Sequence, residues 1–178
     1  MSRFLPLILF LLLGALLAVG LTISDTKTHI PSPLIGRPVP DFDLPVLDDP
    51  ARRLGPQDFS GAPYLINFWA SWCVTCVVEH PVITDLARSG RLRVVGLNFR
   101  DEPDDALGWL ARHGDPYAVS VSDYDGRVSI NFGVYAAPES FLVDPQGEIV
   151  YKHIGALTPE VLEETILPMV SAMQASGS

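Results

Sequence analysis

The sequence predicts an α/β fold in which a central mixed β-sheet is flanked by helices, with a β-hairpin extension at its N-terminal side. Two continuous apolar runs rich in strand formers, residues 62–70 and 92–99, are typical of central strands covered on both faces. Segments with helix start and stop signals, residues 74–88 and 101–113, alternate with these runs. A turn composition at residues 144–147 joins two further strand-like segments, which indicates an antiparallel hairpin in the same sheet.

The N-terminal region is the most apolar part of the chain. Residues 4–23 carry no charge, and a helix needs about 20 such residues to cross a bilayer. Arg3 lies just before this segment and favours an orientation with the N-terminus inside. We therefore expect a transmembrane anchor at residues 4–23 after a cytoplasmic tip at residues 1–3. A cleaved signal peptide is the alternative, because residues 18–20 (AVG) loosely match a small-x-small cleavage site.

The remainder of the chain reads as a tether and one domain. Residues 24–36 are polar and contain two prolines, which is typical of a short tether, and residues 37–178 are enough for one domain with a proper core. The net charge of -9 argues against a nucleic-acid partner, which requires concentrated Lys and Arg. Two cysteines are too few for a disulfide framework or a four-cysteine zinc site.

The first half of the domain begins with an irregular segment. Residues 38–53 alternate apolar and polar side chains, which predicts an irregular β-hairpin or an edge segment. The apolar run at 62–70 predicts a central strand, followed by a helix over 74–88 that ends near Gly90. The run at 92–99 predicts the next buried strand.

The second half alternates in the same way. Residues 101–113 predict a helix, because acidic residues crowd its first turn, basic residues its last, and Gly114 follows. A short strand over 118–121 then leads into a turn-rich stretch at 123–126. Residues 140–143 and 148–153 predict the two strands of the closing hairpin.

A final helix is predicted from its start signals. Thr158 is a suitable N-cap and Pro159 suits the first helical position. Pro168 should kink this helix. One face of it is apolar and should pack on the sheet; its residues are Val161, Leu162, Ile166, Met169, Val170 and Met173.

The pattern that carries chemistry is C-x-x-C. Cys73 follows a predicted buried strand and begins a predicted helix, whose unpaired N–H groups and positive partial charge stabilise a thiolate. A thiolate is the nucleophile in disulfide exchange. Cys76 lies one turn deeper on the same helical face and can close a disulfide with Cys73. We therefore assign Cys73 as the nucleophile and Cys76 as the resolving thiol.

Other interpretations of the pair are weaker. Attachment of c-type haem needs C-x-x-C-H, and Val77 stands where the histidine would be. A metal site remains open, with His80 as one further ligand, although no second ligand cluster is visible. A purely structural disulfide between residues so close in sequence would constrain little of the unfolded chain. A peroxidase is disfavoured, because no P-x-x-x-T-x-x-C pattern precedes Cys73.

Residues 69–76 (WASWCVTC) resemble the W-A-x-W-C-x-x-C active site of membrane-associated, TlpA-like bacterial thioredoxins. More narrowly, the chain resembles the thiol:disulfide interchange proteins of cytochrome c biogenesis, the DsbE/CcmG family. The resemblance spans residues 35–170 in unbroken order and implies a thioredoxin-like fold. Further matching segments are residues 34–38 (LIGRP), 76–80 (CVVEH), 94–96 (VVG), 133–139 (GVYAAPE) and 141–144 (FLVD).

The resemblance also implies a substrate surface. Pro138 would be a cis-proline facing the cysteines, with Ala137 offering its backbone edge to an extended partner segment. The alternative for Pro138 is an ordinary loop proline. Trp72 would form a surface rim against which the substrate packs, whereas Trp69 belongs to the core. Tyr135 would line the same groove, or else be an interior tyrosine.

Two acidic residues match the family's acids around the thiols. A carboxylate at Glu79 or Glu139 would oppose thiolate formation and so modulate the redox pair. The alternatives are a helix acid of favourable electrostatics for Glu79 and a solvated loop charge for Glu139. The chain departs from the family at Val74, where proline is usual, and residues between the cysteines affect the reduction potential and with it the choice of partner.

The function implied is that of a reductant that keeps the C-x-x-C-H thiols of apocytochrome c reduced for haem attachment, directly or through a haem-ligation component with a cysteine pair. Electrons would come from a membrane thiol reductase, and no metal or cofactor beyond the Cys73–Cys76 pair is expected. The protein would be a single-pass protein of the bacterial inner membrane with its domain on the periplasmic side. The rivals are a TlpA-like reductase of broader specificity and a non-redox accessory protein that binds apocytochrome or metal.

Overall fold

A computed structural model describes residues 5–24 and 32–176. The chain divides into two compact units, and the boundary between them in the sequence follows Pro31. The predicted tip at residues 1–3 and residues 25–31 of the predicted tether lie outside the described residues. In the first unit, α1 (Leu5–Ser24) is one continuous helix, and its side chains at 7–17 are exposed. Counting only the described residues, no helix reaches the length and apolarity that a membrane span requires. The predicted anchor is therefore not confirmed.

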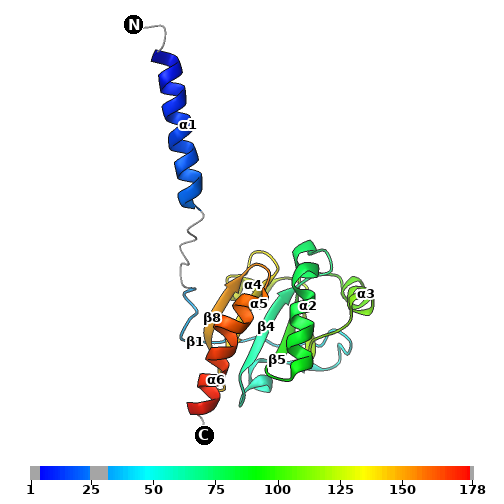
Figure 1. The fold of residues 1–178 in the computed structure, drawn as a ribbon. Helices are drawn as coiled ribbons and strands as arrows, with labels where there is room; N and C mark the ends of the chain where they lie inside the picture. Colours follow the sequence, from blue (N-terminus) through cyan, green and yellow to red (C-terminus); the bar gives the residue numbers. More distant parts are fainter. Residues whose placement is uncertain (1–4, 25–31, 177–178) are drawn as a thin grey trace. The chain divides into compact units, whose positions relative to one another are not determined.

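The second unit is built on a six-stranded mixed sheet in the order β1-β8-β7-β4-β5-β6 (Figure 1). The strands β4, β5 and β6 run parallel, whereas β7, β8 and β1 continue the other half of the sheet with antiparallel pairs. This confirms the predicted mixed sheet. The strands are β1 (Arg37–Pro38), β4 (Tyr64–Trp69), β5 (Arg93–Phe99), β6 (Val119–Asp123), β7 (Glu139–Val143) and β8 (Glu148–Ile154).

The predicted N-terminal hairpin is present in a short form. Strands β2 (Leu44–Pro45) and β3 (Arg53–Leu54) pair antiparallel, and the 3₁₀ turn η1 (Pro56–Phe59) follows. Val46, the residue directly after β2, forms an antiparallel β-bridge with Val121 in β6. The hairpin thus partly covers the β6 edge of the sheet, which would otherwise expose unpaired backbone groups.

Helices cover both faces of the sheet, as predicted. On one face, α2 (Val74–Ser89) and the C-terminal helical segments pack on β4, β5 and β7 through a shared apolar cluster that includes Leu65, Leu86 and Leu142. On the other face, the short α4 (Arg127–Asn131) and the N-terminal hairpin cover a second cluster centred on Phe68, Phe132 and Phe141. A third cluster joins α3 (Pro103–His113) to the end of β4.

The C-terminal helix begins as predicted but is interrupted. The Thr158 hydroxyl caps its start by accepting the Val161 N–H, and α5 (Pro159–Val161) leads into a π-helical turn, η2 (Leu162–Ile166), before α6 (Leu167–Ser176). Pro168 lacks the N–H that an α-helix would use, and the wider turn just before it accommodates that loss. Leu167, which was not among the predicted apolar residues of this helix, is buried together with them.

The helix α4 was not predicted, and β6 starts one residue later and ends two residues later than expected. The carboxylate of Asp123 explains the helix and the later strand end, because it accepts the N–H groups of Val128 and Ser129 at 3.2 and 2.7 Å. Asp123 is fully buried at the end of β6 and satisfies the first turn of α4. Because Asp123 is polar, the pattern of apolar residues predicted neither the end of β6 nor the start of α4.

Candidate active site

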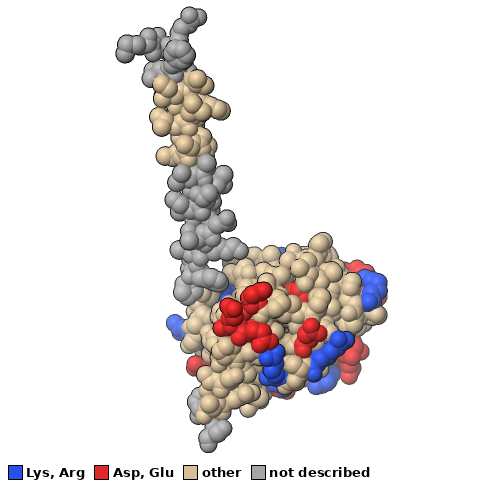
Figure 2. All heavy atoms as spheres, viewed as in Figure 1, with Lys and Arg blue, Asp and Glu red and all other residues tan. Residues whose placement is uncertain are grey.

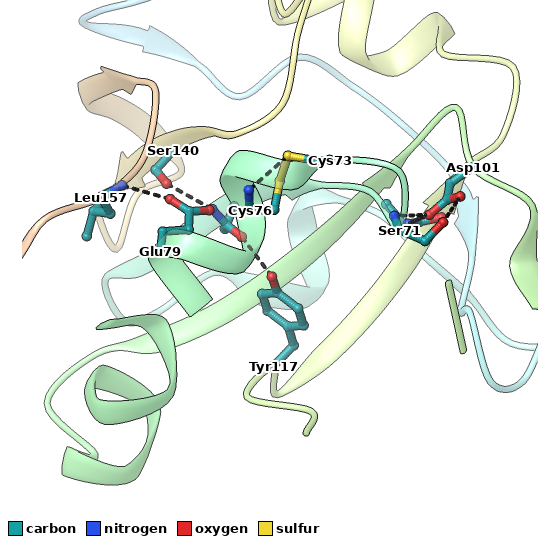
Figure 3. The surroundings of a disulfide bond; sticks show 10 residues. Ser71, Cys73, Cys76, Glu79, Asp101, Tyr117, Ser140 and Leu157 are labelled. Atoms are coloured by element: carbon teal, nitrogen blue, oxygen red, sulfur yellow. Dashed lines mark hydrogen bonds between the residues drawn. A yellow bond between two sulfur atoms is a disulfide. The ribbon is translucent and has the colours of Figure 1, made fainter. Parts of the chain in front are cut away.

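The two cysteines form a disulfide at the start of α2, directly after β4 and a short turn. Cys73 is the N-cap residue, and its Sγ accepts the backbone N–H of Cys76 at 3.0 Å (Figure 3). Both sulfur-bearing residues are almost completely buried. Once the disulfide is reduced, the same N–H donor and the helix N-terminus favour negative charge on Cys73. The geometry therefore suits the predicted nucleophile at Cys73.

A buried carboxylate that the sequence analysis did not select holds the turn before Cys73. The Asp101 carboxylate accepts the Ser71 N–H and the Ser71 hydroxyl, both at 2.6 Å, and the Asn98 side-chain amide at 2.9 Å (Figure 3). Asp101 follows β5, so this contact ties the redox turn to the neighbouring strand. The signal in the sequence was weak, since an acidic residue at the start of a predicted helix has an ordinary explanation.

Trp72 lies at the rim of the site, where it was expected. Its side chain is about half exposed, and its indole N–H donates to the Arg100 carbonyl at 2.9 Å. Arg100 has a positive φ of 46°, a conformation that is uncommon outside glycine. The indole ring also packs on Phe99, with ring centroids 6.0 Å apart. Trp72 is thus held in place while one side of its ring remains open to a partner.

Glu79 lies in α2, about one turn after Cys76, at the centre of a buried hydrogen-bond network (Figure 3). One carboxylate oxygen accepts the Asn67 amide at 2.8 Å, and the other accepts the Leu157 N–H at 2.8 Å. Asn67 also donates to the Ser140 hydroxyl at 3.1 Å and accepts the Tyr117 hydroxyl at 2.8 Å. The network thus links α2 to strands β4 and β7, to the segment just before β6, and to the segment just before α5.

Burial gives Glu79 an unusual titration. Loss of hydration raises the pKa of its carboxyl from 4.5 to about 7, against the opposing effect of the two hydrogen bonds that it accepts. Glu79 stands three residues after Cys76 in α2, and residues at this spacing are neighbours on a helix. A group that exchanges its proton near neutral pH therefore lies next to the resolving thiol.

Glu139 lies in a different environment. It opens β7, is almost completely buried and pairs with Lys152 through its Oε2 at 2.7 Å. Burial raises the pKa of Glu139, while Lys152 and the backbone N–H of Tyr135 partly offset that effect. The alternative of a solvated loop charge is wrong. Whether Glu139 modulates the thiols stays a prediction.

The segment before Glu139 carries the other predicted substrate residues. The Ala137–Pro138 peptide bond is cis, which confirms the expectation of a cis-proline over an ordinary loop proline. Ala137 packs against the cluster that contains both cysteines. Tyr135 is 84% exposed, so the alternative of an interior tyrosine is wrong. This loop, residues 133–138, therefore lies beside the disulfide with an aromatic side chain in solvent.

His80 is engaged with protein groups. Its Nε2 lies 3.1 Å from the His113 carbonyl, its ring packs edge-on against Trp109, and burial lowers its pKa. Across residues 5–24 and 32–176, no group of three or more His, Cys, Asp or Glu side chains is arranged to hold a metal ion.

The surface around the disulfide is apolar. In the view of Figure 2, acidic and basic side chains are intermixed over the domain and no broad basic area is visible. Large hydrophobic side chains around the start of α2 and the cis-proline loop are exposed: Trp72, Val74, Val77, Val78 and Tyr135. Such a surface suits contact with apolar parts of a polypeptide.

Comparisons with known proteins agree with this arrangement. The Redoxin family model matches residues 34–167. A protein named thiol:disulfide interchange protein DsbE from Xylella fastidiosa is 40% identical over 176 residues, covering 96% of this chain and 89% of the relative. The DsbE of Escherichia coli K12 is 44% identical over 168 residues, covering 92% and 90%.

The fold has a matching solved structure. A Chlorobium tepidum protein described as a thiol:disulfide interchange protein DsbE superposes with a TM-score of 0.67 at 29% identity. The match covers 76% of this chain and 97% of that protein. The fold of the second unit is therefore thioredoxin-like, with a central mixed sheet and flanking helices.

Proposed function

Because this chain belongs to the DsbE family of thiol:disulfide interchange proteins, we propose that it reduces the haem-attachment cysteines of apocytochrome c, or those of a maturation partner. The chain is a thiol:disulfide oxidoreductase whose redox pair is Cys73 and Cys76. The observation that supports the proposal most directly is the disulfide at the start of α2, with the Cys76 N–H donating to the Cys73 sulfur. This redox pair needs no further cofactor.

The exchange proceeds in two steps once the pair is reduced. The Cys73 thiolate attacks one sulfur of the partner's disulfide, which forms a mixed disulfide and releases the partner's other sulfur as a thiolate. The Cys76 thiolate then attacks the Cys73 sulfur, re-forms the Cys73–Cys76 disulfide and releases the partner's second thiolate. Two electrons pass to the partner, and a membrane thiol reductase restores the dithiol by the reverse exchange.

Glu79 supplies a proton acceptor for the second step. Its pKa of about 7 leaves it partly ionised at neutral pH, when it can accept the proton of the Cys76 thiol. Its carboxylate would also oppose a second negative charge while both cysteines are reduced. Both effects favour attack by one thiolate at a time, which suits a selective reductant.

The partner would bind across the loop of residues 133–138 and the rim at Trp72. An extended segment can pair with the backbone at Ala137, beside Pro138, and bring its sulfur towards Cys73. The exposed rings of Trp72 and Tyr135 would then pack on either side of that segment.

The same proposal includes a place in the cell. Residues 4–23 form an uncharged stretch preceded by Arg3, which supports a single-pass anchor in the bacterial inner membrane with the domain on the periplasmic side. The periplasm is kept oxidising, so cysteines that await haem need a dedicated reductant held close to them.

The decisive experiment traps the mixed disulfide in cells. A Cys76→Ser variant cannot resolve the adduct on Cys73, so its partners remain covalently attached and can be identified by mass spectrometry after acid quenching. Capture of proteins with a C-x-x-C-H segment, or of a haem-ligation component with a cysteine pair, is the expected result. A Cys73→Ser, Cys76→Ser double variant is the control and should capture nothing.

The second candidate is a membrane thiol reductase of broader specificity. Val74 favours it, because this residue replaces the proline usual in the family and its side chain is 82% exposed at the partner surface. Capture of a wide range of unrelated exported proteins would favour this candidate. No adduct at all would overturn the redox proposal and favour a non-redox accessory role.

A further inference from the structure

We propose that Lys152 is a positioning residue for partner binding, because its contacts with Gly133 and Glu139 hold the loop of residues 133–138 in place. The inference rests on the proposed use of this loop as the partner surface, and it concerns a residue to which the sequence analysis gave no role. Lys152 lies in β8 and would touch neither the reacting sulfurs nor the partner. Its effect would pass through Glu139 and the loop backbone.

Three contacts define the position of the Lys152 ammonium group. It lies 2.7 Å from the Glu139 carboxylate and 3.2 Å from the Gly133 carbonyl oxygen, and it sits over the Phe141 ring at 5.0 Å from the ring centroid. The two side chains of the ion pair are only 10% and 7% exposed. These contacts hold Lys152 in one place, unlike a lysine on an open surface.

The sheet register explains why these groups meet. Lys152 stands opposite Phe141, and Glu139 stands opposite Ile154, two residues further along β8. Lys152 and Glu139 are therefore diagonal neighbours on one face of the β7–β8 pair. Their position puts the ion pair directly under the point where the chain leaves the cis-proline loop and enters β7.

The ion pair holds the loop at two points. Lys152 binds the Gly133 carbonyl at the start of the loop. The Tyr135 N–H, in the middle of the loop, lowers the pKa of Glu139 and therefore faces its carboxylate, and Glu139 itself follows Pro138 at the end of the loop. The loop that carries the exposed Tyr135 ring and the Ala137 backbone is thus held by a buried ion pair. Without Lys152 the loop would lose its tie at Gly133, and Glu139 would be left unpaired.

The kinetic test compares a partner that needs the loop with one that does not. The Lys152→Met variant keeps the chain length and removes the charge, whereas Lys152→Arg keeps the charge. With a disulfide-bonded peptide as oxidant of the reduced protein, we expect the second-order rate constant of Lys152→Met to fall by about tenfold or more, through weaker peptide binding. Oxidation by a small linear disulfide such as oxidised glutathione should change less than twofold.

The controls separate positioning from general damage. Lys152→Arg should restore most of the rate with the peptide. Arg53→Met removes another ion pair of the same length, Arg53–Asp43 at 2.7 Å, which is largely exposed, and should alter neither rate. Because Lys152→Met leaves a buried carboxylate unpaired and could impair folding, the double variant Lys152→Met, Glu139→Gln removes both charges and should show the same loss of rate with the peptide.

A second readout does not depend on any partner. Hydrogen exchange at the Tyr135 amide should be at least about tenfold faster in Lys152→Met than in the wild type, and close to the wild type in Lys152→Arg. An unchanged Tyr135 amide, or equal loss of rate with the peptide and with glutathione, would overturn the inference. A wild-type protein that reacts with other peptides but not with C-x-x-C-H peptides would instead overturn the proposed substrate and leave the role of Lys152 standing.

Discussion

The carboxylates of Glu79 and Glu139 lie on opposite faces of the central sheet. Glu79 binds Asn67, whose amide also binds Ser140, so these side chains share the face covered by α2. Glu139 precedes Ser140 in β7 and therefore points to the other face, where it pairs with Lys152. Only Glu79 is on the same side as the helix that carries Cys76. The two acids that the sequence analysis grouped together should accordingly behave differently on mutation.

The Glu79→Gln variant should remove a pH dependence of stability. The pKa of Glu79 rises from 4.5 in the unfolded chain to about 7 in the folded protein, so the folded state binds the proton more tightly. Stability from this group is therefore greatest at low pH and falls as the pH rises through this interval. Between about pH 5 and pH 8 the wild type should lose roughly 2–3 kcal/mol more than the variant.

Urea unfolding of the oxidised proteins at the two pH values measures this difference. Glu148→Gln changes an exposed glutamate at the start of β8 and serves as the control, with the same pH dependence as the wild type. Equal slopes for wild type and Glu79→Gln would show that Glu79 does not titrate in this interval.

The Asp101→Ala variant should loosen the redox turn. It removes the acceptor for the Ser71 N–H, the Ser71 hydroxyl and the Asn98 amide, and it leaves these donors without a partner in a region of low solvent access. We expect a loss of about 3 kcal/mol in the free energy of unfolding. Asp85→Ala, at an exposed position in α2, should change it by less than about 1 kcal/mol. A similar small change for Asp101→Ala would mean that water replaces the carboxylate at little cost.

Local signals in the sequence predicted the strand and the helix that position the cysteines, but not the side-chain contacts that hold the surrounding turn and loop. The strand β4 and the helix α2 follow from an apolar run and from start and stop residues within one segment, and the placement of Cys73 follows with them. The contacts of Asp101 with Ser71 and of Lys152 with Glu139 join residues far apart in sequence. Their partners depend on strand order and register, which periodicity does not determine.

The Gly96→Ala variant should disturb the aromatic packing behind the disulfide. An added Cβ would lie 2.5 Å from the Ser120 hydroxyl oxygen, 2.8 Å from Trp69 Nε1 and 2.9 Å from Tyr117 Cγ. Trp69 stacks on Tyr117 with ring centroids 5.5 Å apart, so a shift of either ring would disturb this contact. Overpacking of this kind costs about 1–3 kcal/mol. Thermal unfolding and tryptophan fluorescence should both report the change.

The same substitution elsewhere should have the opposite sign. Gly108 lies inside α3, and a Cβ there would meet only the flexible end of Arg112 at 3.4 Å. Gly108→Ala should therefore stabilise the protein by about 0.5–1 kcal/mol through helix propensity. A stabilising Gly96→Ala would show that the space above Gly96 adapts to the added methyl group.

The Val74→Pro variant restores the proline usual in the family and should fit this backbone. Val74 is the first residue of α2, a position that proline favours, and Cys73 before it has the extended conformation (φ -84°, ψ 102°) that a following proline requires. The Val74 side chain is 82% exposed, so its loss removes little packing. The restricted unfolded chain should add about 0.4–1 kcal/mol of stability, which corresponds to a rise of roughly 1–4 °C in Tm.

Differential scanning calorimetry of the oxidised wild type and Val74→Pro measures the shift. The bond from the Cys76 N–H to the Cys73 sulfur does not involve residue 74, so the variant should keep its disulfide and its reactivity with oxidised glutathione after reduction within about twofold. A fall in Tm would mean that the backbone N–H of Val74 makes a contact that the native turn needs. Valine would then be a requirement of this turn, and the departure from the family would have a structural cause.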